Sequence, residues 1–332
     1  MNYKKWLIGV SITTFTLYLV TVLLHYLINP SQLFKHSITQ KKFLNTKEYS
    51  KIQFNLLKEN KYTLVFGSSR DVRISSNMLN ESVLNLANLY TEPGDIYNFL
   101  SQLNSRQIGN IRKILFLVDV HTFRDEINKN KIDYINTNYT SLISDVFLMN
   151  SSKILSTKND LVFNYIKKPD YYIHKDGSSI PFIEKTTYQT SVVFKSQERQ
   201  RYTKKSLLTF TKINDFVKNN QIETIYFTPT FMDMMFAKID LNLEKEKYKH
   251  LLENNIKGLH ILLYLNKVSN LKDNNHYFAF SDASHLNAKY LKKSLYNNIF
   301  NNKNNSTYVT NIMELNTYFK KLENIQKNLQ QK

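Results

Sequence analysis

The chain has 332 residues, of which 42% are hydrophobic and 22% are charged, so it can fold around a sizeable core. It contains 6 glycines and 5 prolines, which excludes collagen-like and proline-rich architectures. The absence of cysteine excludes disulfides, thiolate zinc sites and cysteine nucleophiles. The net charge is +18, but the lysines are spread along the chain without a basic block, which favours a solvated surface over a nucleic-acid-binding tail.

Residues 6–28 carry no formal charge and match the length of about 20 residues that crosses a hydrocarbon core. Lys4 and Lys5 precede this segment, and Asn29-Pro30 ends it. A cleaved signal peptide is the alternative, but its apolar region would be shorter and would end in small residues. The sequence therefore predicts a transmembrane anchor over 1–30 in contact with membrane lipid. We expect a single-pass protein of the inner or cytoplasmic membrane, with the N-terminus in the cytoplasm and the large domain outside.

A polar connector at 31–60 is followed by short apolar runs that alternate with amphipathic patterns. Strands are expected at 62–66, 83–86, 114–118, 223–227 and 276–280, and helices at 49–58, 95–103, 139–149, 197–219, 243–265 and 288–300. Residues 122–195 are polar and are interpreted as an insertion in a domain that spans 61–301, and 302–332 as a polar C-terminal tail with one helical stretch. Strands alternating with helices predict an α/β fold with three layers, α/β/α, around a mainly parallel sheet.

Two segments that follow predicted strands carry the parts of a serine catalytic centre. Gly67-Ser68-Ser69 places a hydroxyl on a tight turn, and Asp282 and His285 lie three residues apart near the C-terminus. A serine becomes a nucleophile when an imidazole removes its proton and a carboxylate orients that imidazole. Because ligands bind at the carboxyl ends of parallel strands, we expect the three side chains at one rim of the sheet. The alternative is that Ser69 and Asp282 only cap helices.

The segments FGSSRD, LNLANLYTEPGDIY and SDASHLN resemble the first, second and last blocks of the SGNH/GDSL hydrolase superfamily. The likeness is to membrane-anchored bacterial members of the DltD-like and polysaccharide O-acyltransferase type. It implies an SGNH/flavodoxin-like domain in which Ser69 is the nucleophile and Asp282 and His285 complete the triad. The backbone N–H of Ser69, with Asn88, is the candidate oxyanion hole. The glycine that the second block normally supplies is absent, and so is the G-x-N-D of the third block.

The resemblance implies a serine esterase or O-acyltransferase that acts on an acylated or acyl-accepting cell-envelope glycan or wall polymer and needs no cofactor. The alternative is a non-catalytic, membrane-tethered accessory protein that binds a glycan or a multi-pass membrane acyltransferase. Nucleic-acid binding is not expected, because the many aromatic residues form no stacking motif.

Two further sets of side chains have residue types suited to binding. His121 with Asp119 and Asp125 could form a metal site, but no second histidine is near, and no metal is expected. The arginines Arg70, Arg73 and Arg124 could bind an anionic substrate, and surface solvation is the interpretation that the sequence favours.

Overall fold

The structure is a computed structural model. It describes residues 3–28, 57, 60–68, 70–87, 92–119, 171–173, 176, 178–181, 204–231, 233–254, 256–265, 280–282, 285–286, 288–300 and 307–331. The helix expected at 139–149, nearly all of that at 49–58 and the first part of the strand at 276–280 lie outside the described residues.

A six-stranded sheet of order β10-β7-β6-β3-β1-β2 forms the centre of the described domain. Every neighbouring pair is parallel except β7 with β10, which confirms the expected α/β fold with a mainly parallel sheet. The strands are β1 (Tyr62–Phe66), β2 (Val83–Asn85), β3 (Ile111–Leu117), β6 (Glu223–Phe227), β7 (Leu259–His260) and β10 (Tyr308–Val309).

The central strands are buried on both faces, as their near-continuous apolar sequences require. In β1, Leu64 and Phe66 join one hydrophobic cluster, whereas Val65, pointing the opposite way, joins the other. In β3, Phe116 and Leu115 are divided between the two clusters in the same manner. The sheet therefore separates two cores and needs helices on both sides.

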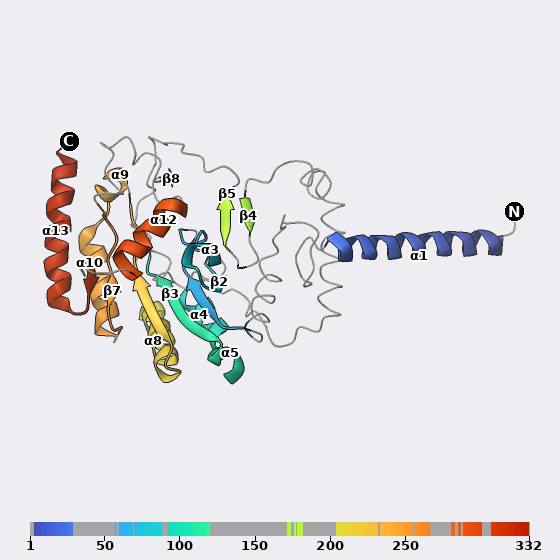
Figure 1. Cartoon of the computed structure of the whole chain (residues 1–332), viewed down its shortest axis with the longest axis horizontal. Coiled ribbons are helices and arrows are strands. Elements are labelled where there is room, and N and C mark those ends of the chain that lie inside the picture. Colours follow the sequence, from blue (N-terminus) through green and yellow to red (C-terminus); the bar gives the residue numbers. More distant parts are fainter. Residues whose placement is uncertain are drawn as a thin grey trace.

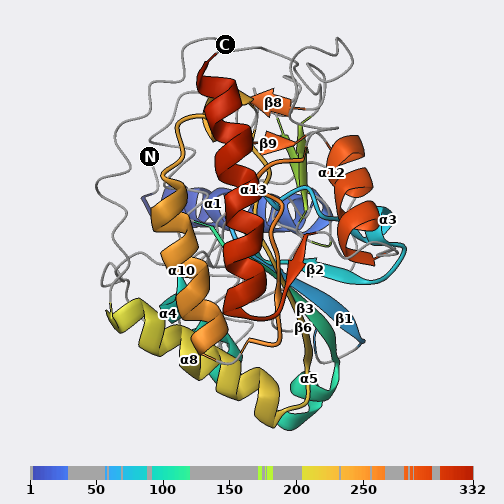
Figure 2. The same cartoon turned by 90° about the vertical axis from the view of Figure 1, so that its left-hand side faces the viewer.

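Helices supply both covers (Figure 2). One cluster includes buried residues of α4, α8, α10 and α13, and the other includes residues of α3 and α12. The helices of the domain are α3 (Ser76–Leu79), α4 (Pro93–Ser101), α5 (Ser105–Gly109), α8 (Lys204–Asn219), α9 (Asp233–Phe236), α10 (Leu241–Glu253), α12 (Ala288–Leu295), the π-helical turn η4 (Tyr296–Phe300) and α13 (Ile312–Gln330).

The single helix expected over 243–265 is wrong in its second half, because α10 ends at Glu253 and β7 follows. Asn254 caps the helix, and its Nδ2 donates to the carbonyl of His250 at 2.6 Å. Gly258 then lies against the ring of Tyr308 in β10, so closely that a Cβ would not fit. The segment 302–332, expected as a polar tail, contains β10 and α13, and α13 contributes Leu315, Phe319 and Leu322 to the core.

The helix α1 (Tyr3–Ile28) stands apart from the sheet and its covering helices (Figure 1). All its described side chains, those of residues 3–20 and Leu23, are exposed. Within the described ranges, no helix meets the combined requirement of length and apolarity for crossing a membrane.

Candidate functional site

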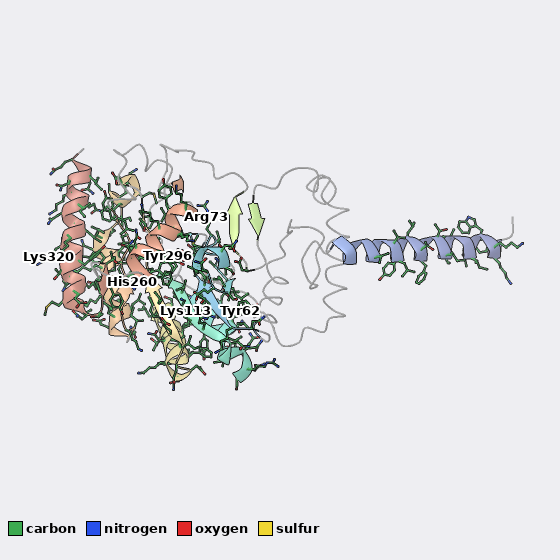
Figure 3. All side chains as sticks on the ribbon, viewed as in Figure 1. Tyr62, Arg73, Lys113, His260, Tyr296 and Lys320 are labelled. Atoms are coloured by element: carbon green, nitrogen blue, oxygen red, sulfur yellow. The ribbon has the colours of Figure 1, made fainter. Side chains whose placement is uncertain are left out.

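The carboxyl ends of β1, β3 and β6 lie side by side, because these three strands are parallel neighbours. They lead directly into Gly67, Val118 and Thr228. Figure 3 shows Arg73 toward this end of the sheet and Tyr62 and Lys113 toward the opposite end. Ligands of parallel α/β sheets bind outside such carboxyl ends, so this rim is where a site is expected.

The turn after β1 requires a glycine at position 67. Gly67 has φ +155°, and a Cβ there would lie 2.6 Å from Cβ of Leu117 and 3.0 Å from Oδ2 of Asp71. The chain then bends back on itself, with the N–H of Asp71 donating to the carbonyl of Ser68 at 3.1 Å and that of Ile74 to the carbonyl of Asp71 at 3.0 Å. The turn formed by Gly67, Ser68 and residues 70–74 is therefore compact and closely packed against β3.

Asn85, the last residue of β2, holds this turn from the side. Its Nδ2 donates to the carbonyls of Asp71 and Ile74, both at 2.8 Å, and its Oδ1 accepts from the N–H of Ala87 at 2.9 Å. The side chain is buried, and these three hydrogen bonds offset the cost of removing its polar atoms from water. This role was not predicted, although the sequence holds a signal for it: a lone asparagine within the apolar run VLNLA.

Two carboxyl groups and one guanidinium lie together at the rim. Arg70 Nη1 pairs with Asp119 Oδ2 at 2.9 Å, and its guanidinium carbon lies 5.5 Å from the ring centre of Phe231, beyond β6. Burial raises the pKa of the Asp71 carboxyl well above its usual value; Asp119 adds to this rise and Arg70 opposes it. Burial and the nearby Asp119 therefore both favour the protonated form of Asp71.

Arg73 links the two sequence blocks that were expected to meet. Its Nη1 donates a hydrogen bond to the carbonyl of Leu286 in β9, 213 positions away. Arg73 is buried, so the interpretation that it is a solvated surface residue is wrong. Arg70 also has only 18% of its side chain exposed, whereas Arg124 lies outside the described residues.

The hairpin of β8 (Phe280–Asp282) and β9 (His285–Leu286) contains both candidate partners of the nucleophile. Asp282 and His285 are paired across the two antiparallel strands. Only the backbone of these two residues is described, and Ser69 and Asn88 lie outside the described residues. The hydrogen bond between Arg73 and Leu286 thus joins the two segments of the chain that carry the predicted triad. The side chains of the triad themselves lie outside the described part.

The insertion contributes one described anchor to the same region. Asp176 lies between β4 (Tyr171–Ile173) and β5 (Ser179–Pro181), which form a small antiparallel hairpin. Its carbonyl accepts from the N–H of Asn85 at 2.6 Å, and its Oδ2 accepts from the N–H of Ser76 at 2.7 Å. The hairpin is therefore fastened to β2 and to the start of α3.

No group of three metal-binding side chains occurs in the part of the chain that the structure describes. Of the residues considered for a metal site, Asp119 is engaged by Arg70, and His121 and Asp125 lie outside that part.

A cavity of about 590 Å³ lies at the amino end of β6, the end opposite to the rim described above. It is bordered by α8, the start of β6 and the turn between α10 and β7. Inside it, the hydroxyl of Tyr226 donates to Oδ1 of Asn214 at 2.6 Å, and Nδ2 of Asn214 donates to the carbonyl of Asn254 at 2.9 Å. These three polar groups therefore satisfy one another.

Comparisons with models of known protein families, with curated proteins and with solved structures found no match.

Proposed function

We propose that the protein is a membrane-anchored serine esterase or O-acyltransferase that acts on a cell-envelope glycan or wall polymer. The observation that carries this proposal is the hydrogen bond from Arg73 to Leu286, because it brings the turn after β1 beside the hairpin of His285. Both lie at the carboxyl end of a parallel sheet, where such a reaction would be expected. The sequence likeness of these segments to SGNH hydrolases supplies the chemistry.

In the proposed reaction, Ser69 Oγ attacks the carbonyl carbon of an ester while His285 accepts the hydroxyl proton. Asp282 orients the imidazole and stabilises its charged form. The tetrahedral intermediate collapses, the proton passes to the departing alcohol, and the acyl group remains on Ser69. Water or a sugar hydroxyl then attacks the acyl-serine, with His285 as base, and regenerates the free hydroxyl. The backbone N–H of Ser69, with Asn88, would stabilise the oxyanion.

We propose that α1 attaches the domain to the membrane. Its exposed residues include Leu7, Ile8 and Phe15, which favour lipid over water. Its threonines do not oppose this, because the hydroxyls of Thr13 and Thr14 donate to the carbonyls four residues earlier, both at 2.9 Å. The protein should therefore stay with the membrane in alkaline carbonate and be released by detergent. A reporter fused after residue 332 should be active only outside the cytoplasm if the helix crosses the membrane as expected.

A non-catalytic accessory protein is the second candidate. The end of β3 favours it, because there Asp119 is committed to Arg70 where the hydrolase family carries its G-x-N-D block. Such a protein would use the same rim to hold a glycan or a multi-pass acyltransferase.

The two candidates differ in the reactivity of Ser69. Purified full-length protein would be treated with a fluorophosphonate probe, which labels activated serines. We expect labelling of the wild type and none of Ser69→Ala. The matched control is Ser179→Ala, because Gly177-Ser178-Ser179 repeats the local sequence in another part of the chain. Equal labelling of wild type and Ser69→Ala would refute the nucleophile. In that case, co-purification of Ser69→Ala with a membrane acyltransferase would support the accessory protein.

A further inference from the structure

A small cavity lies where the turn after β1, the end of β6, β9 and α12 come together. It has a volume of about 20 Å³. One water molecule needs roughly 10–15 Å³ of such space, so there is room for a single molecule of that size and for nothing larger. Its lining includes Arg70 and Asp71 from the turn, Leu286 from β9 and Ser294 from α12.

Buried polar atoms without hydrogen-bond partners are concentrated at this cavity. Among the described residues there are four such side-chain atoms, and three of them belong to residues that line it: Arg70 Nε, Asp71 Oδ2 and Ser294 Oγ. Asp71 and Ser294 are each only 2% exposed. Leaving one buried polar atom unsatisfied costs about 1–3 kcal/mol, so three at one place call for a shared partner.

The chemistry of the three atoms defines that partner. Arg70 Nε only donates, a serine hydroxyl both donates and accepts, and a carboxyl oxygen can do either according to its protonation. The partner must therefore accept at least one hydrogen bond and be able to donate others. A cation is disfavoured by the guanidinium of Arg70, and an anion by the carboxyl group of Asp119 that pairs with it. A neutral water molecule satisfies the size, the charge and the hydrogen bonding together.

We propose that this cavity binds one water molecule, which joins Arg70 and Asp71 of the nucleophile turn to Ser294 of α12. The consequence of this water molecule for catalysis rests on the proposed function. The turn carries Ser69, and α12 begins three residues after His285, so the water fixes the distance between the segments that bear the two reacting groups. Asp71 and Ser294 are in this sense positioning residues. The hydrogen bond from Arg73 to Leu286 acts on the same two segments.

The water can be counted directly in the full-length protein in detergent. Oxygen-17 relaxation dispersion measures water molecules that stay bound longer than the protein takes to tumble. Ser294→Val would place a methyl group in the cavity and remove one partner, so we expect one long-lived water fewer than in the wild type. Ser101→Ala, on the exposed end of α4, is the control and should leave the number unchanged. An equal count in wild type and Ser294→Val would overturn the proposal.

A second measurement does not depend on a variant that folds. A crystal structure of the wild type should show a single density peak within about 3.2 Å of Arg70 Nε, Asp71 Oδ2 and Ser294 Oγ. A dry cavity, or contact of the peak with one of these atoms only, would overturn the proposal.

The positioning role has its own readout. A small displacement of reacting groups costs up to about 100-fold in rate, so we expect Ser294→Val to slow fluorophosphonate labelling of Ser69 about tenfold or more. Asp71→Asn keeps the shape and a hydrogen-bonding group and should retain most of the rate. Loss of the water without a change in labelling would refute the positioning role. If the wild type is labelled no better than Ser69→Ala, the proposed function fails, and the water count still decides the cavity.

Discussion

Replacing Gly67 by alanine should destabilise the protein through one identifiable contact. The new Cβ would lie 2.6 Å from Cβ of Leu117 and 3.0 Å from Oδ2 of Asp71. Leu117 cannot give way easily, because it belongs to β3 and is paired with Phe227 of β6. Its Cβ is also fixed to the backbone, unlike the end of a flexible side chain. The φ of +155° at Gly67 adds strain for any residue with a side chain.

The expected magnitude combines the steric and the backbone cost. Overpacking a well-packed core costs about 1–3 kcal/mol, and holding a non-glycine residue at an unfavourable backbone conformation costs about 1–3 kcal/mol. We therefore expect Gly67→Ala to lower the free energy of unfolding by about 2–6 kcal/mol. For a protein of this size each kcal/mol corresponds to roughly 2–4 °C in Tm, so the loss should be visible in a simple thermal scan.

Gly109→Ala provides the matched control. Gly109 is the last residue of α5, and a Cβ there would meet no atom within 4 Å. Alanine favours a helix by about 0.5–1 kcal/mol over glycine, so this variant should be neutral or slightly stabilised. Both variants would be compared by urea unfolding followed by circular dichroism in detergent. If the two differ by less than about 0.5 kcal/mol, the close packing of the turn against β3 is wrong.

Buried polar groups give rise to three further expected outcomes. Folding raises the pKa of Asp71 above its ordinary value of 3.8. The contribution of Asp71 to stability should therefore fall by up to about 1.4 kcal/mol per pH unit as the pH rises from 3.8 to the pKa of the folded state. Urea titrations at several pH values should show that Asp71→Asn removes this slope. Burial lowers the pKa of His260 from 6.5 to about 4, so acid should destabilise the protein between these two values, and a His260→Gln variant that kept the same acid slope would contradict this. Arg73→Met should cost about 1–3 kcal/mol, since the carbonyl of Leu286 loses its buried donor, and should speed amide exchange in the peptide that contains β9; unchanged exchange would argue against the link.

The sheet could be predicted because its main strands carry their own signal. The runs at 62–66, 114–118 and 223–227 are short, apolar and rich in β-branched and aromatic residues, which is typical of strands buried on both faces. The structure has β1, β3 and β6 there, with their ends shifted by three residues at most. Local sequence was sufficient because each of these strands is defined by burial rather than by a particular partner.

β7 could not be recognised in the same way. It has two residues within the longer apolar run Leu259–Tyr264, and periodicity alone does not distinguish such a run from the end of a buried helix. Gly258, just before β7, lies against Tyr308, a residue 50 positions further along the chain. That contact exists only once the fold has formed, so no local pattern reveals it.

The candidate site also has a part that could be predicted from local sequence and a part that could not. Gly67 and the strand before it mark the turn from sequence alone, because a tight turn after a buried strand needs glycine. The roles of Arg70 and Arg73 arise from pairings with residues distant in the chain, and spacing carries no information about them. Arg73 is the clearest case, since its charge suggests a surface position and its hydrogen bond to β9 places it inside.

The attachment of Asp176 to Asn85 has a consequence for self-association. β2 is an edge strand of the sheet, and an edge with free N–H and C=O groups can pair with the edge of another molecule. Here the N–H of Asn85 is already taken by the carbonyl of Asp176, and the hairpin of β4 and β5 lies alongside. The insertion therefore shields this edge. A variant that lacks residues 171–181 would expose the three-residue strand β2 to other molecules and should be more prone to aggregate.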